Sequence, residues 1–177
     1  MASAAESAGS AMLHALHATH PAPDRAARMM LYGQFVGSWS GSRVAWDSQG
    51  ARSETPAEVH FDWVLQGRAV QDVWIAPVRS AGQPRMYGTT LRVYDPQADH
   101  WHITWTDPIT QAFARMIGRK LGDDIVQECR TERGMLRQWL FTGIAADSFH
   151  WIWRDASADG QGWDVRAEYF LRRSSHR

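Results

Sequence analysis

The chain has 177 residues, with 19 basic and 19 acidic side chains, one cysteine and ten tryptophans. This length suits one domain with a packed core, and zero formal charge argues against binding nucleic acid by neutralising phosphates. One cysteine excludes an intramolecular disulfide framework, and no apolar run approaches the roughly 18 residues needed to cross a bilayer. We therefore expect a cytoplasmic protein with no nucleic-acid or membrane partner. The excess of tryptophan is left to explain.

The N-terminal segment differs in composition from the rest. Residues 1–20 are rich in alanine and serine and lack the charged start and long apolar stretch of a secretory signal. We expect a disordered tail there, followed by one domain over residues 21–177. The clearest helix candidate runs from Pro21 to Gly33, where Asp24 can cap the N-terminus.

After the helix candidate the hydrophobic period changes to two. Val59, Phe61 and Trp63 alternate with polar residues, which is the pattern of a half-buried strand. Turn-forming residues separate such stretches, as in Asp95-Pro96. The pattern predicts strands at 35–46, 52–65, 68–77, 85–95, 100–107, 111–118, 123–131, 135–143, 148–155 and 162–172.

Short strands with tight connections form an antiparallel meander. A meander of this length leaves two exposed edges, which closure into a barrel removes. The predicted fold is an all-β, closed or nearly closed antiparallel up-and-down β-barrel of about ten strands with a short N-terminal helix.

Seven tryptophans share a predicted strand face with other large apolar residues. They are Trp63, Trp101, Trp105, Trp139, Trp151, Trp153 and Trp163. In a small barrel that face is the interior, which is either filled by side chains or holds one small ligand. The sequence leaves both alternatives open: a plugged barrel, or an aromatic pocket for a flat or greasy molecule.

Polar residues assigned to the same interior favour a ligand. Asp72, Arg115 and Arg137 alternate with large apolar residues. A buried charge is costly unless it is paired or meets a ligand, so the three could form a structural ion pair or anchor a carboxylate or phosphate. Tyr87 and Thr89 are assigned to the same interior as neutral hydrogen-bonding groups.

A short motif that follows the helix candidate and opens the first strand resembles a known family. Gly37–Trp39 is similar to the G-x-W motif of lipocalins and the wider calycin group, and the segments Gly67–Trp74 and Tyr94–Pro108 resemble bacterial lipocalin-like proteins of unknown function. The resemblance spans about residues 33–173. It implies a ten-stranded calycin-like barrel, with a helix or loop over one mouth and a structural role for Trp39.

Metal and cofactor sites are weakly indicated. His100 and His102 share one strand face about 7 Å apart, a spacing that occurs in metal-binding barrels. Some calycins bind haem through one histidine, and His60, His102 and His150 are the candidates here. All of these histidines alternate with inward residues, so we expect them to face outward and expect no metal and no cofactor. Cys129 is expected to be a buried, inert thiol.

We therefore expect a protein that encloses a small hydrophobic or anionic-headed ligand. The predicted ligand-binding residues are Trp63, Trp74, Tyr87, Thr89, Trp105, Arg115, Arg137, Trp139, Trp151, Trp153 and Tyr169. One alternative is a barrel enzyme, an isomerase, cyclase or hydratase-lyase of secondary metabolism, with Asp72 as the catalytic acid–base group. A second is a structural or oligomerising module with a filled barrel, and homodimer formation is left open.

Overall fold

The computed structural model describes residues 11–76 and 86–174. It confirms the closed, ten-stranded antiparallel barrel. The barrel strands are β2 (Gly37–Trp46), β3 (Arg52–Val64), β4 (Ala69–Ala76), β5 (Met86–Asp95), β6 (His100–Asp107), β7 (Ala112–Leu121), β8 (Asp124–Arg130), β9 (Leu136–Thr142), β10 (Ser148–Ala156) and β11 (Trp163–Arg173). All ten predicted strands are present, with ends that shift by a few residues.

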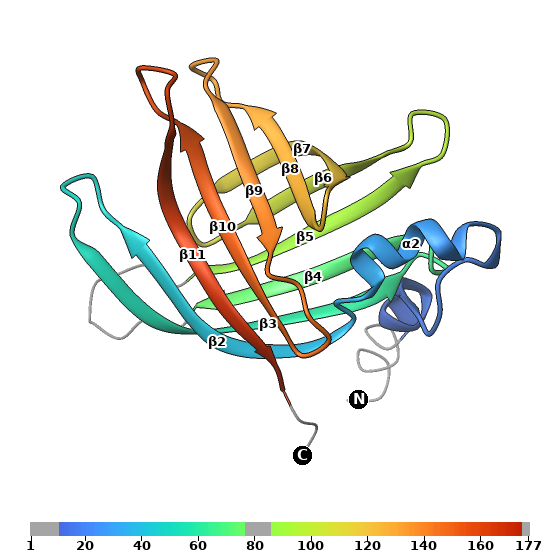
Figure 1. The fold of residues 1–177 in the computed structure, drawn as a ribbon. Coiled ribbons are helices and arrows are strands. Elements are labelled where there is room, and N and C mark those ends of the chain that lie inside the picture. The colour runs from blue at the N-terminus through green and yellow to red at the C-terminus, as the bar shows by residue number, and fades with distance from the viewer. Residues whose placement is uncertain (1–10, 77–85, 175–177) are drawn as a thin grey trace.

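Barrel closure depends on the pairing of β2 with β11. Each strand from β2 to β11 pairs antiparallel with the next, and β2 also pairs with β11 along the register Gly41–Leu171 and Arg43–Tyr169 (Figure 1). A Cβ atom at Gly41 would lie 1.9 Å from the Phe170 carbonyl oxygen, so the two backbones approach too closely there for any larger residue.

The N-terminal segment differs from the disordered tail expected over residues 1–20. Residues 1–10 lie outside the described residues, but residues 11–16 are helical. The short strand β1 (His17–Ala18) pairs with the end of β3. None of the described helices is long and apolar enough to span a membrane.

The predicted helix begins later than expected. A 3₁₀ turn, η1 (Pro23–Arg25), leads into the helix α2 (Ala26–Gly33). The predicted cap at Asp24 is wrong, because its carboxylate accepts hydrogen bonds from Arg25 and Arg68 instead of a helix backbone N–H.

Helix α2 closes one end of the barrel (Figure 1). Its Tyr32 is fully buried and packs edge-on against Trp101. Phe35, just after the helix, contacts Trp39, whose indole Nε1 donates a hydrogen bond of 2.7 Å to the Phe35 carbonyl. Trp39 is 1% exposed, so it belongs to the packed end of the barrel.

One of the seven predicted inward tryptophans lies outside. The register between β10 and β11 pairs Trp153 with Ala167 but Arg154 with Val165, which leaves Arg166 as an extra residue on β11. Such a bulge reverses the alternation of faces beyond it. Trp163 is therefore 36% exposed and lies under the Arg154 guanidinium, at 4.4 Å from its ring centroid.

Candidate ligand cavity

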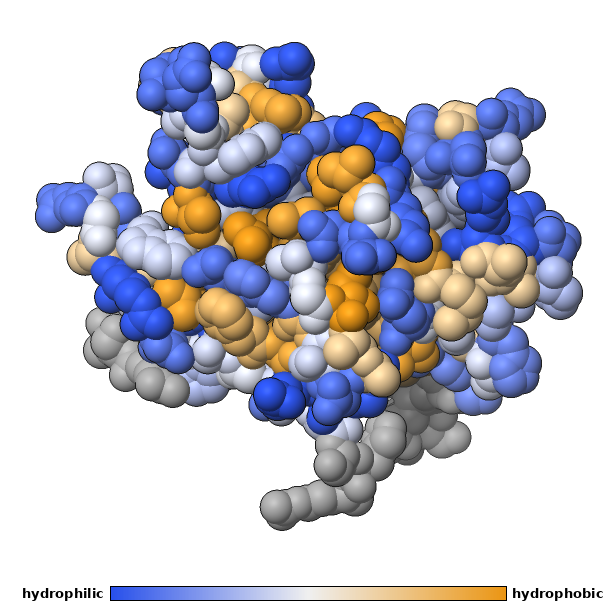
Figure 2. Space-filling view, in the orientation of Figure 1, coloured by the Kyte–Doolittle hydropathy of each residue, from blue (hydrophilic) through white to orange (hydrophobic). Residues whose placement is uncertain are grey.

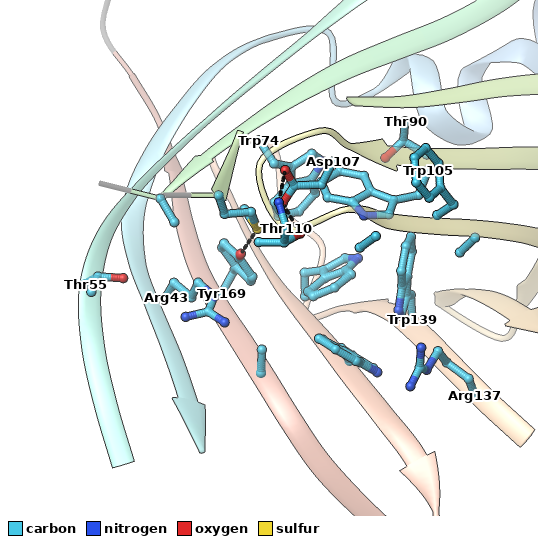
Figure 3. A pocket seen from close by; sticks show the side chains of 18 of the residues that line it. Arg43, Thr55, Trp74, Thr90, Trp105, Asp107, Thr110, Arg137, Trp139 and Tyr169 are labelled. Atoms are coloured by element: carbon cyan, nitrogen blue, oxygen red, sulfur yellow. Dashed lines mark hydrogen bonds between the residues drawn. The ribbon is translucent and has the colours of Figure 1, made fainter. Parts of the chain in front are cut away.

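A cavity of about 570 Å³ occupies the end of the barrel opposite α2. Its wall is formed by residues of every barrel strand except β8, together with Thr110 in the turn between β6 and β7. Seven predicted ligand-binding residues line it: Trp74, Trp105, Arg137, Trp139, Trp151, Trp153 and Tyr169. Figure 3 shows several of these side chains directed into the space between the strands. The hairpins that project beyond the strands carry mainly hydrophilic residues (Figure 2).

The aromatic wall is continuous because neighbouring rings touch. The Trp74 ring centroid lies 5.1 Å from that of Trp151 and 4.9 Å from that of Tyr169. Trp139 contacts Trp105 at 5.9 Å and Trp151 at 5.6 Å. Edge-on and tilted contacts of this kind hold rings in fixed orientations, so the wall has a defined shape.

Trp63 belongs to the opposite end. It is 6% exposed and packs over Gly33 of α2, where a Cβ atom would lie 2.1 Å from the Trp63 ring. It therefore helps to close the barrel and does not line the cavity.

Tyr87 and Thr89 face outward, and their predicted interior position is wrong. Residues directly opposite each other in antiparallel strands share a face. Thr90 is opposite Asp72 and Gly88 is opposite Trp74, so the interior residues of β5 are the even-numbered ones. Tyr87 is 45% exposed, and the Thr89 hydroxyl donates a hydrogen bond to the Asp72 backbone carbonyl.

The predicted interior position of Arg115 is also wrong by one residue. Ala114 is opposite Trp105, which faces the cavity, so Ala114 and Met116 point inward. Arg115 is consequently exposed on the outer face.

Asp72 points inward, but it is paired and does not line the cavity. Its Oδ2 lies 2.5 Å from Nη1 of Arg92, and its Oδ1 accepts a hydrogen bond of 2.8 Å from the Thr90 backbone N–H. Arg92 also donates to Gln127 and lies over the Tyr32 ring at 4.9 Å. Asp72 is thus enclosed by its partners, an arrangement that does not support the predicted acid–base role.

Arg137 lines the cavity and is held by Asp155. Its Nε and Nη2 donate to the two carboxylate oxygens at 2.7 and 3.1 Å, and its guanidinium covers the Trp153 ring at 4.8 Å. Burial raises the pKa of Asp155, but the hydrogen bonds and charge of Arg137, with smaller contributions from Trp153 and Arg166, bring the pKa below its usual 3.8. This carboxylate therefore stays ionised and neutralises Arg137.

Several lining residues were not identified from the sequence. They include Arg43, Thr55, Met86, Thr90, Arg92 and Asp107. Alternation from Trp39 through Gly41 places Arg43 on the inner face, so the signal for this residue was present. Arg92 was hidden because its strand was assigned the opposite facing.

The cavity wall holds unpaired hydrogen-bonding groups. Five of its buried polar atoms have no hydrogen-bond partner among the described residues: Arg43 Nε, Thr55 Oγ1, Thr90 Oγ1, Trp139 Nε1 and Trp151 Nε1. Three of them are N–H donors and two are hydroxyls. Buried polar groups in native proteins are nearly always satisfied, and these atoms are free to form hydrogen bonds with a molecule in the cavity.

The histidines lie on the outer face of the barrel. His60 and His102 are exposed and His150 is half-buried, and none of the three lines the cavity. His100 and His102 gather with Asp95, with one candidate ligand atom of each within 4.8 Å of the others. Cys129 is half-buried, and burial raises the pKa of its thiol.

Comparison with protein-family models and with curated protein sequences gives no match. Solved structures give the fold. The crystal structure of Rv2717c from M. tuberculosis aligns with a TM-score of 0.61 and 17% identity over 88% of this chain and 99% of that chain. The S-type phycobiliprotein lyase CPES from Guillardia theta aligns with a TM-score of 0.59 and 11% identity over 83% of this chain and 92% of that chain. These likenesses fit a calycin-like barrel fold for this chain.

Proposed function

We propose that this protein binds a small, largely apolar molecule with hydrogen-bond acceptors, enclosed in the tryptophan-lined cavity. The observation that carries the proposal is the set of unpaired donors in an aromatic wall. Trp139 and Trp151 are each 7% exposed, and their indole N–H groups have no partner among the described residues. An indole N–H normally finds an acceptor when it is buried, and a bound ligand would supply one.

The size of the cavity supports a ligand of modest dimensions. About 570 Å³ lies within the range of 300–1,000 Å³ that is typical of small-molecule sites. A barrel filled by its own side chains would not leave this volume, so the alternative of a purely structural module is the weaker one. The phycobiliprotein lyase shares the fold with this chain at 11% identity, and a shared fold does not identify a ligand.

Blocking the cavity tests the proposal. Ala114 lines it opposite Trp105, so Ala114→Trp places a further indole in the space that a ligand would use. Ala98→Trp, in the exposed turn after β5, is the matched control. The probe is 2-naphthamide, a neutral planar aromatic with an amide carbonyl, titrated by calorimetry and by quenching of tryptophan emission.

We expect saturable 1:1 binding to the wild type, about tenfold weaker binding to Ala114→Trp and an unchanged Kd for Ala98→Trp. Absence of binding by 2-naphthamide and by a panel of neutral alkyl amides would overturn the proposal. Equal binding to both variants would place the probe elsewhere on the protein and would overturn it as well.

A further inference from the structure

Three polar side chains form a row across neighbouring strands in the cavity wall. Arg43 on β2 is directly opposite Thr55 on β3 and directly opposite Tyr169 on β11. Direct partners share a face, and all three residues line the cavity. Figure 3 shows Arg43 between the other two.

The row contains two buried atoms that lack a partner. Arg43 Nε and Thr55 Oγ1 are shielded from solvent and form no hydrogen bond within the described residues. A guanidinium N–H and a hydroxyl side by side can donate to the oxygens of one oxyanion.

Arg43 differs from the other cavity arginines in having no carboxylate partner among the described residues. Arg92 pairs with Asp72, and Arg137 pairs with Asp155. Arg43 forms no ion pair with any carboxylate in residues 11–76 and 86–174. It is therefore the arginine of the cavity wall whose charge is left without a counterion in the described part of the chain.

Neither Asp107 nor Tyr169 forms an ion pair with Arg43 among the described residues. Asp107 lines the cavity, but its oxygens accept hydrogen bonds from the Ile109 and Thr110 backbone N–H groups and from the Thr110 hydroxyl. Burial raises the pKa of Tyr169 to about 12, against the opposing effect of Arg43, so the phenol is neutral. Its hydroxyl donates to the Met86 sulfur at 3.3 Å.

We propose that the ligand is a carboxylate, and that Arg43 and Thr55 bind its charged end. One unpaired cation compensates one negative charge, which favours a carboxylate over a doubly charged phosphate. The apolar body would lie against Trp74 and Trp151, whose rings contact Tyr169 at 4.9 and 5.3 Å. This inference rests on the proposed function and names its ligand class.

The test compares two probes that differ in charge but hardly in shape, 2-naphthoate and 2-naphthamide. We expect the wild type to bind the carboxylate about tenfold more tightly than the amide. Arg43→Gln should abolish this preference, because it weakens binding of the carboxylate far more than binding of the neutral amide. Arg115→Gln, which removes an exposed outer arginine, should keep the preference.

Thermal unfolding would reveal a folding defect in Arg43→Gln. A second variant, Thr55→Val, tests the same site if Arg43→Gln does not fold. Thr55→Val replaces the hydroxyl with a methyl group of similar size and should weaken 2-naphthoate about fivefold, more than it weakens 2-naphthamide. Equal binding of both probes by the wild type, or tighter binding of 2-naphthyl phosphate than of 2-naphthoate, would overturn the carboxylate inference while the proposed function stands. If neither naphthalene probe binds and the neutral alkyl amides do not bind either, the proposed function itself fails.

Discussion

Asp72 and Arg92 form an ion pair inside the barrel, with both side chains at most 1% exposed and 2.5 Å between Oδ2 and Nη1. The pair joins β4 to β5, and its arginine lines the cavity. Removing one partner would leave the other charge buried and uncompensated. We expect Asp72→Asn to lower the free energy of unfolding by about 3 kcal/mol, measured by urea unfolding.

Replacing both charges separates this pair from a catalytic role. The double variant Asp72→Leu with Arg92→Met fills the same space with apolar side chains and leaves no buried charge unpaired. Its free energy of unfolding should therefore exceed that of Asp72→Asn. If the unfolding free energy of Asp72→Asn lies within about 0.5 kcal/mol of the wild-type value, the ion pair does not stabilise the fold. That result would favour an acid–base role for Asp72 again.

The sequence predicted the fold better than it predicted the site. The periodicity of a strand can be recognised within the strand itself, but which of its faces points into the barrel depends on the neighbouring strands. The alternation around Trp63 and Trp101 identifies each strand without reference to its neighbours. Which face turns inward depends on the register with the next strand, and an error of one residue reverses every side chain. Thr89 and Arg115 were misplaced for this reason, since their own strands carry no decisive polarity.

Two further features were not accessible from local pattern. The bulge at Arg166 breaks the alternation of β11, and nothing in the composition around Trp163 marks it. The partner of Asp72 is Arg92 on the neighbouring strand, whereas the alternation placed only Arg115 and Arg137 in the interior with Asp72. Arg43, by contrast, could have been found by extending the alternation from Trp39.

Asp155 should make the stability of the barrel pH-dependent. Its pKa in the folded state lies below 3.8 because Arg137 holds the ionised form. The unfolded chain therefore takes up the proton first as the pH falls, and the stabilisation is complete above the ordinary pKa and lost as the pH falls through the folded value. Asp155→Asn should cost about 2 kcal/mol at pH 7, and its difference from the wild type should narrow below about pH 4.

The control for this prediction is Asp164→Asn. Asp164 is 52% exposed and its contact with Arg166 is 3.5 Å, so it should contribute less than about 0.5 kcal/mol at any pH. A difference between wild type and Asp155→Asn that stays constant from pH 7 to pH 3 would contradict the assignment of the pKa shift to this carboxylate.

Gly88 sets the position of Trp105 in the cavity wall. A Cβ atom there would lie 2.3 Å from the Trp105 ring, so the indole must move. We expect Gly88→Ala to cost about 2 kcal/mol in unfolding free energy, the range typical of overpacking, and to change the near-ultraviolet circular dichroism. Gly162→Ala is the matched control, because its Cβ would meet only Ser157 Oγ at an ordinary 3.7 Å. Equal stability of the two variants would show that Trp105 is free to reorient.

Trp39 and Trp151 offer a matched pair of substitutions that separates folding from binding. The Trp39 indole donates to the buried Phe35 carbonyl, whereas the Trp151 indole N–H is buried without a partner in the described residues. Trp39→Phe leaves the buried Phe35 carbonyl without its hydrogen-bond donor. Trp151→Phe instead removes a buried donor that has no acceptor among the described residues. Trp39→Phe should therefore be less stable than Trp151→Phe by about 2 kcal/mol in urea unfolding.

Ligand binding should follow the opposite order. If the carbonyl of 2-naphthamide accepts from the cavity indoles, Trp151→Phe should raise its Kd about fivefold, since one hydrogen bond is lost. Trp39→Phe should leave the Kd unchanged, because Trp39 does not line the cavity. Calorimetry measures the Kd of 2-naphthamide for both variants. A larger loss of affinity for Trp39→Phe would mean that the unpaired indoles do not contact the ligand.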